Sequence, residues 1–275
     1  MIAVYTDRGE NRLISIDMST GNWEHVEMPF GSVPNSALAA VSTTSFLMSG
    51  NSSHLPEAIY LVELQPQLNV TKLRDSSQEI ISPELISRPE RITIPATFSG
   101  KDQGIYGFIH KPCNPLYIAP ESHLPPLIIV PYGGPINHIT PGLSLETQLF
   151  TSRGFAVLNL NYRGSSGHGQ RYRELINGQR GVYDVEDVVT AVRYLVSLEI
   201  IDASRVGIRG SSAGGYTVLQ ALCAHPAVFA GAVSRYVISD LSRLDPSTHK
   251  LESRHKETLL FQPGMSEIDK ETVLN

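Results

Sequence analysis

Five consecutive residues of this sequence have the types and spacing suited to nucleophilic chemistry. Gly210, Ser211, Ser212, Ala213 and Gly214 form a G-x-S-x-G pattern, and Ser212 is the serine with glycine both two residues before and two residues after it. In such a pattern a tight turn holds the middle serine in a strained backbone with its hydroxyl exposed. That hydroxyl can attack a carbonyl carbon and form an acyl-enzyme. The N–H of Ala213 then points to the place where an oxyanion would develop.

The segments around this pattern favour a functional role over an ordinary Gly/Ser turn. A short apolar strand is predicted over 205–209, and a helix is predicted over 213–224. The strand-turn-helix order is the context that the pattern requires. Gly210 and Gly214 leave room for the turn, and Ser212 is therefore the candidate nucleophile.

A second candidate element lies upstream, in the segment Pro131-Tyr-Gly-Gly-Pro135. It directly follows the apolar run 127–132, where a fold of this kind places its second oxyanion donor. The glycines allow close approach of the backbone, and Tyr132 can offer its phenolic O–H to the developing charge. The alternative is a plain turn in which Tyr132 packs on its neighbours.

The elements that position these residues change in character near residue 90. Before it, Leu13–Ile16 with Trp23–Val26, and Ser45–Ser49 with Ala58–Leu64, are typical of β-hairpins. After it, apolar strands alternate with helices. The predicted strands are 127–132, 156–162, 205–209 and 231–237, and the predicted helices are 185–196 and 213–224. This alternation predicts an α/β fold with a mostly parallel sheet, and Ser87–Gly107 is expected to be the junction.

Four motifs in order resemble the catalytic domain of the prolyl oligopeptidase (S9) family. They are Asn161-Tyr-Arg-Gly-Ser-Ser-Gly-His-Gly169, Asp184-Val-Glu-Asp-Val188, Gly210-Ser-Ser-Ala-Gly-Gly-Tyr216, and Thr248-His-Lys250 with Glu252-Ser-Arg254. The resemblance covers about residues 90–255 and is greatest to the dipeptidyl-peptidase and acylaminoacyl-peptidase branch. Residues 1–85 resemble the closing blades of the β-propeller that precedes the hydrolase in that family.

This resemblance implies an α/β-hydrolase over 90–275 after partial propeller blades over 1–85, and cleavage of short peptides. It also implies that Ser212 is the nucleophile and that Tyr132 and Ala213 are the oxyanion donors. The acylaminoacyl type commonly has His where this chain has Tyr132. Tyr is typical of the prolyl oligopeptidase and dipeptidyl peptidase IV types, so the branch stays open.

The remaining members of a catalytic triad are expected to be missing. Hydrolases of this fold supply Ser, then Asp or Glu, then His, and only the residues after 212 are left for both. The candidates are His225, His249 and His255 with Asp240, Asp245 and Asp269. None has the family position. We therefore expect an internal slice of a longer enzyme, cut within both the propeller and the hydrolase, with little or no peptidase activity.

Composition excludes several other classes of protein. A net charge of -5 gives no basic footprint for nucleic acid, and no apolar stretch is long enough for a membrane helix. The start has no signal-peptide pattern, so a cytoplasmic protein is expected. Cys113 and Cys223 fit no metal or disulfide framework, and we expect no metal or cofactor. The expected partner is a peptide substrate, and the oligomeric state stays open. An esterase or acyl hydrolase on the same fold, or a non-catalytic remnant, are the alternative functions.

Overall fold

The computed structural model describes residues 1–33, 38–77, 81–98, 101–120, 122–237 and 255–274. The chain divides into two compact units. The first contains residues 1–90, 110–118 and 140–154, and the second contains residues 91–109, 119–139 and 155–275. This division differs from the predicted domains, 1–85 and 90–275, in that residues 110–118 and 140–154 belong with the first unit.

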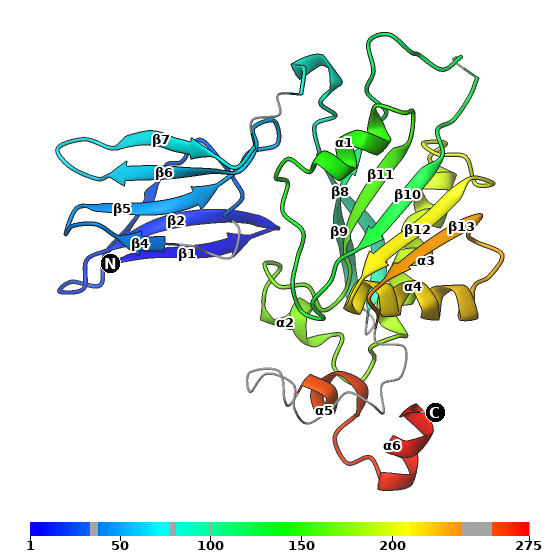
Figure 1. Ribbon diagram of the computed structural model, residues 1–275. Coiled ribbons are helices and arrows are strands. Elements are labelled where there is room, and N and C mark those ends of the chain that lie inside the picture. Colours follow the sequence, from blue (N-terminus) through cyan, green and yellow to red (C-terminus); the bar gives the residue numbers. More distant parts are fainter. Residues whose placement is uncertain (34–37, 78–80, 99–100, 121, 238–254, 275) are drawn as a thin grey trace. The chain divides into compact units, whose positions relative to one another are not determined.

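Antiparallel sheets form most of the first unit (blue to cyan in Figure 1). One sheet contains β1 (Ile2–Asp7), β2 (Glu10–Ile16) and β3 (Trp23–Val26), and the other contains β4 (Leu38–Ala40), β5 (Ser45–Gly50), β6 (Ala58–Glu63) and β7 (Asn69–Asp75). Both predicted hairpins are present, with Leu13 opposite Val26 and Ser49 opposite Ile59. Burial alternates along β6, as expected for a strand with one face on a core. The short helices η2 (Pro83–Leu85) and α1 (Leu145–Thr151) complete this unit.

A six-stranded sheet forms the centre of the second unit, in the order β13-β12-β10-β11-β9-β8. Its strands are β8 (Glu90–Phe98), β9 (Lys101–His110), β10 (Leu127–Pro131), β11 (Ala156–Asn161), β12 (Val206–Ser211) and β13 (Gly231–Arg235). The pairs β10/β11, β10/β12 and β12/β13 are parallel. Strands β10 and β11 are rich in Val, Ile and Leu, as is typical of central parallel strands that are covered on both faces.

Helices α3 (Tyr183–Ser197) and α4 (Ala213–Ala224) pack against each other and against β10. Valines at three- and four-residue spacing give α3 its buried stripe, as the sequence predicts. Shorter helices are α2 (Gln170–Glu174), α5 (His255–Leu260) and α6 (Glu267–Leu274). The predicted fold class, an α/β-hydrolase with a mostly parallel sheet after an all-β segment, is confirmed.

The boundary between the two units, at Glu90 and Arg91, falls within the expected junction Ser87–Gly107, but β8 and β9 of the main sheet occupy most of that segment. Two prolines and three glycines in this segment suggested a linker. Strand β8 lies at the edge of the sheet, where proline is tolerated because one row of N–H groups has no strand to bond. Gly107 is needed for close packing: a Cβ there would lie 2.7 Å from the carbonyl oxygen of Asn159 on the neighbouring strand.

The carboxyl ends of the parallel strands lie along one edge of the sheet. Pro131 is opposite Leu160, and Ser211 is opposite Arg235. The residues that follow β10, β11, β12 and β13 therefore meet at this edge, which is where ligands bind in open α/β sheets.

Candidate active site

Ser212 lies between the end of β12 and the start of α4, as predicted. Its backbone has φ 54° and ψ −123°, a left-handed conformation that costs a non-glycine residue about 1–3 kcal/mol. Two backbone hydrogen bonds hold it there, from Ser212 N to the Arg235 carbonyl at 3.0 Å and from Tyr216 N to the Ser212 carbonyl at 3.1 Å. The Ser212 side chain is exposed, and no described residue hydrogen-bonds to its hydroxyl. This is the geometry of a nucleophile elbow.

The glycines around Ser212 are required by close contacts between backbone segments. A Cβ on Gly210 would collide with the Gly214 carbonyl, and one on Gly214 would lie 2.7 Å from the Tyr132 carbonyl oxygen. A Cβ on Gly133 would lie 2.9 Å from the Ser211 carbonyl oxygen and 3.6 Å from the Ser212 Cβ. The loop after β10 therefore runs directly beside the elbow, and the structure brings the two predicted elements together.

The backbone of Tyr132 lies next to the elbow, and its side chain is buried in the core. The side chain is 6% exposed, and its ring stacks on that of Tyr162 with centroids 4.3 Å apart. Its hydroxyl lies 2.9 Å from the Ser165 hydroxyl, and Ser165 also donates to the Tyr162 carbonyl at 2.6 Å. Burial raises the pKa of Tyr132 well above its usual range. The phenol therefore keeps its proton at neutral pH and stays a hydrogen-bond donor.

The loop after β10 is fastened to the end of β11 by Asn161. The buried side-chain amide accepts from Ile139 N at 2.7 Å and donates to the Ile139 carbonyl at 3.0 Å. Both backbone groups of Ile139 are thus satisfied by one side chain. This fixes the far end of the loop that begins at Tyr132.

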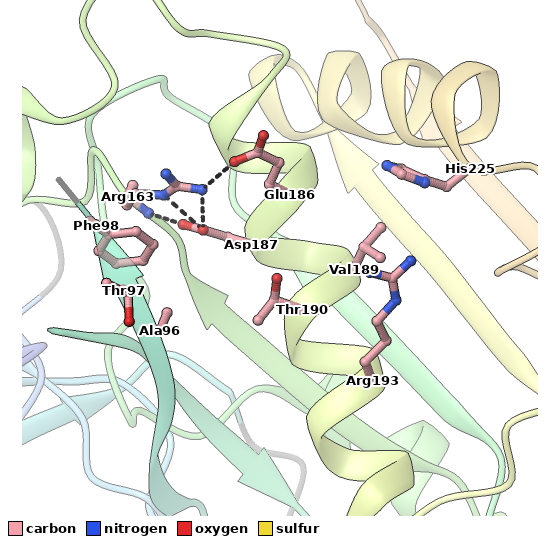
Figure 2. Close-up of a pocket in the computed structure, with 10 residues that line it drawn as sticks. All are labelled: Ala96, Thr97, Phe98, Arg163, Glu186, Asp187, Val189, Thr190, Arg193 and His225. Carbon is pink, nitrogen blue, oxygen red and sulfur yellow. Dashed lines mark hydrogen bonds and ion pairs between the residues drawn. The ribbon is translucent and has the colours of Figure 1, made fainter. Parts of the chain in front are cut away.

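Arg163, in the loop after β11, and Asp187, on α3, form a buried ion pair (Figure 2). Asp187 accepts from Arg163 N at 2.6 Å and from Arg163 Nε at 2.8 Å. The guanidinium also pairs with Glu186 at 2.9 Å and lies 4.2 Å from the Phe98 ring centre. Burial raises the pKa of Asp187 to about 6, against the lowering effect of Arg163. Helix α3 is in this way attached to the loop after β11.

This ion pair forms one wall of a cavity of about 310 Å³. Figure 2 shows α3 in the middle of the lining residues, with Phe98 on one side of the helix and His225 on the other. Its lining residues are Ala96, Thr97, Phe98, Arg163, Glu186, Asp187, Val189, Thr190, Arg193 and His225. Ser212 and Tyr132 do not line it, so the cavity is not the space in front of the candidate nucleophile.

The histidines and aspartates considered as the other members of a triad lie in three parts of the chain. His225 follows the last residue of α4, at the far end of a twelve-residue helix about 18 Å long, and is too distant from Ser212. His249, Asp240 and Asp245 lie outside the described residues. His255 begins α5, and Asp269, on α6, accepts a hydrogen bond from the Ser266 hydroxyl at 2.7 Å.

Several residues that shape the site had no role in the sequence prediction. Asn161, Arg163, Asp184 and Asp187 fall within the quoted motifs, and Arg180 lies outside them. One signal was available: Asp184 and Asp187 alternate with the valines of the buried stripe of α3. A carboxylate in such a position needs a paired cation, because burying an unpaired charge is very costly.

Part of the chain that includes Ser212 matches a known protein family. The model of the prolyl oligopeptidase family matches residues 141–263, a segment that includes the elbow and α3. Residues 141–263 are thus similar to the prolyl oligopeptidase family. The resemblance predicted from the four motifs is confirmed.

Relatives of this family are peptidases. The acylamino-acid-releasing enzyme of Rattus norvegicus is 32% identical over 138 residues, which is 50% of this chain and 18% of the relative. The dipeptidyl aminopeptidase BIII of Pseudoxanthomonas mexicana is 34% identical over 119 residues, 43% of this chain and 17% of the relative.

A solved structure, that of a puromycin-hydrolyzing peptidase of Mycobacterium tuberculosis, matches nearly the whole chain. It has 34% identity and a TM-score of 0.86, over 97% of this chain and 40% of that protein. This chain thus spans less than half the length of the relatives it matches. Among the described residues, no helix is long and apolar enough to cross a membrane, and no cluster of His, Cys, Asp and Glu could hold a metal.

Proposed function

We propose that Ser212 is the nucleophile of a serine peptidase that cleaves amide bonds of short peptides or aminoacyl amides. The observation that carries the proposal is the left-handed backbone of Ser212 between β12 and α4, with an exposed hydroxyl. The aminoacyl amide class is suggested by the similar puromycin-hydrolyzing peptidase. Peptides are suggested by the names of the other relatives.

The reaction would proceed through an acyl-enzyme. Ser212 Oγ attacks the carbonyl carbon and loses its proton to a base, and the carbonyl oxygen becomes an oxyanion. The N–H of Ala213 and a donor from Tyr132 would stabilise that oxyanion. The C–N bond then breaks, the amine leaves with a proton, and water hydrolyses the serine ester.

The base is the part of this mechanism that the described residues do not supply. Serine is a weak nucleophile unless a base lies within hydrogen-bond distance of its hydroxyl. No described residue hydrogen-bonds to Ser212 Oγ. We therefore propose that the chain as given reacts with strong electrophiles but turns over peptides slowly. The oxyanion site and binding alone leave about 10³–10⁴-fold catalysis over water.

Labelling with a fluorophosphonate probe tests the nucleophile. We expect slow covalent labelling of the purified chain at Ser212, located by mass spectrometry, and loss of labelling in Ser212→Ala. Ser211→Ala is the matched control and should still be labelled. Ser211 is the neighbouring residue and also has a hydroxyl, but it lies within β12 and not at the elbow. Labelling that persists in Ser212→Ala, or an unlabelled wild-type chain, would show the assignment to be wrong.

Turnover assays test the reaction class and the base. An aminoacyl-nitroanilide and a short nitrophenyl ester would be compared with wild-type chain and with Ser212→Ala. We expect amide turnover near the background of the variant. Robust turnover that vanishes in the variant would contradict the proposed lack of a base and would point to His249 or His255. Hydrolysis of the ester alone would favour the acyl hydrolase alternative.

We also propose a cytoplasmic location. Cys113 and Cys223 are both free thiols, and free thiols persist in reducing compartments. Immunofluorescence of the full-length protein in its own cell would test this, and a secreted form would contradict it.

A further inference from the structure

One buried arginine contacts both the start of α4, next to Ser212, and the residue that follows β11. Arg180 precedes α3, and its side chain is 5% exposed. Its Nη2 donates to the Ala213 carbonyl at 2.6 Å and to Thr217 Oγ1 at 3.0 Å. Its Nη1 donates to the Tyr162 hydroxyl at 2.9 Å. A single planar guanidinium therefore connects the first turn of α4 to the residue that follows β11.

The charge of Arg180 is matched inside the same cluster. The carboxylate of Asp184, with a fully buried side chain, lies 3.2 Å from Nη1. Asp184 also accepts from Thr217 Oγ1 at 2.7 Å and from Gly181 N at 2.6 Å. The guanidinium and the carboxylate of the cluster thus each have several hydrogen-bond partners, and buried polar networks whose members are satisfied favour one geometry.

Each arm of this cluster ends beside a residue that carries a candidate oxyanion donor. One arm holds the carbonyl of Ala213, and the N–H of the same residue, in the first turn of α4, would face the developing charge. The other arm holds Tyr162, and the Tyr162 ring stacks on the Tyr132 ring at an angle of 7°. The spacing between the donors from Ala213 and Tyr132 therefore depends on one side chain that touches neither substrate nor nucleophile.

The position of Arg180 is itself fixed by the segment around α5. Gly178 N donates to the Thr258 carbonyl at 2.9 Å, and Arg180 N donates to the Leu259 carbonyl at 3.1 Å. The side chains of Leu259, Leu260 and Phe261 are buried. The loop that presents Arg180 is thereby anchored on both its backbone and its side chain.

We propose that Arg180 is a positioning residue of the oxyanion site. It holds the Ala213 peptide and, through Tyr162, the Tyr132 ring at a fixed separation. This inference rests on the proposed function of Ser212. Misplacement of a reacting group by about 1 Å lowers a rate about 100-fold, and loss of one oxyanion donor lowers it about 100- to 1,000-fold. Arg180 acts on both donors, so its removal should be visible in the chemical step.

The test uses variants that avoid a buried unpaired charge. Arg180→Met combined with Asp184→Asn removes both charges, a change that proteins commonly tolerate. Arg180→Lys keeps the charge, but its ammonium cannot reproduce the planar fork. Arg193→Met, at an exposed arginine of α3, is the matched control. Thermal unfolding identifies the variants that fold.

The first readout is fluorophosphonate labelling of the full chain as a function of probe concentration. In the double variant we expect the maximal labelling rate to fall about 10- to 100-fold, with a half-saturating concentration within about twofold of wild type. Arg180→Lys should recover part of the rate, and Arg193→Met should match wild type. A folded double variant with an undiminished maximal rate would overturn the proposal, because a purely structural ion pair changes only stability.

The second readout, amide hydrogen exchange of residues 213–216, separates this proposal from that of Ser212. If the wild-type chain is not labelled, the assignment of Ser212 as the nucleophile is wrong. The positioning role of Arg180 is still supported if residues 213–216 exchange faster in the double variant than in Arg193→Met. Equal exchange overturns it. If the double variant does not fold, Arg180→Lys decides by the same two readouts, and wild-type values in both overturn the proposal.

Discussion

At the scale of single residues, the region behind Ser212 is unusual for its buried charges. Arg163, Arg180, Asp184 and Asp187 are each less than one-tenth exposed. Burial of a charge costs several kcal/mol unless good hydrogen bonds and an opposite charge compensate. Each of these four groups has both. Such pairs contribute little net stability, and their value lies in fixing the geometry of the backbone that they contact.

The raised pKa of Asp187 leads to a prediction about pH. Burial raises this pKa from 3.8 to about 6, so between about pH 4 and pH 6 the folded state binds more protons than the unfolded state. The free energy of unfolding contributed by Asp187 therefore falls as pH rises through this window, by up to about 3 kcal/mol. Above pH 6 the loss is complete. Urea unfolding at several pH values should show this component in wild type and not in Asp187→Asn.

The control for this experiment is Glu186→Gln. Glu186 pairs with the same Arg163, but its side chain is 53% exposed, so its variant should keep the wild-type pH dependence. Each variant is compared with wild type as a difference, which removes the contribution of the other carboxylates. A pH dependence that is unchanged in Asp187→Asn would contradict the assignment.

At the scale of elements, short connections between strand ends hold the site together. The loop after β10 contacts the elbow through Gly133 and contacts the end of β11 through Asn161. The elbow contacts the end of β13 through Ser212 N. Because parallel strands end at one edge, residues far apart in sequence, such as Gly133 and Ser211, lie next to each other.

Asn161 provides a test of this arrangement. Asn161→Ala leaves the N–H and carbonyl of Ile139 without their partner and should lower the free energy of unfolding by about 1–3 kcal/mol. Amide exchange at Ile139 should become faster. Asn159→Ala, two residues earlier on β11, is the control, because its side chain makes no hydrogen bond to any described residue. Equal exchange at Ile139 in the two variants would show that Asn161 does not fasten the loop.

The sequence correctly predicted helices and strands whose apolar residues recur with a clear period. It missed strands whose prolines and glycines are acceptable only because of the neighbouring strands. Helix α4 occupies the predicted range, 213–224, because the elbow glycine and the run of helix formers mark both ends. Strands β8 and β9 were taken for a junction, because Pro95, Gly104 and Gly107 are acceptable only through their position at a sheet edge or against a neighbouring strand. That information is absent from local sequence.

The candidate site divides in the same way. The Ser212 motif is local, so its backbone and the closeness of the Tyr132 loop were predictable from residues 131–135 and 210–214. The roles of Arg180 and Asn161 were not predictable. Each acts on a residue more than 20 positions away, and nothing in the spacing of polar residues identifies such a partner.

At the scale of the whole molecule, the chain has two hydrophobic cores. One contains Leu13, Phe46 and Val62 of the first unit, and the other contains Leu158, Ile129 and Val188 of the second unit. The described members of the two clusters share no residue. Because burial of apolar surface is the main source of stability, each core should stabilise its own unit.

The last prediction compares one leucine from each core. Leu13 is 3% exposed and Leu158 is 0% exposed, and Leu→Ala at a buried position costs about 2–5 kcal/mol. Hydrogen exchange measured by mass spectrometry should become faster in β1, β2 and β3 in Leu13→Ala, with β10, β11 and β12 unchanged. Leu158→Ala should give the opposite pattern and should also slow labelling of Ser212, since Tyr162 directly follows β11. If Leu13→Ala speeds exchange in β10 as much as in β2, the two cores unfold as one cooperative unit and the stability of the elbow depends on both.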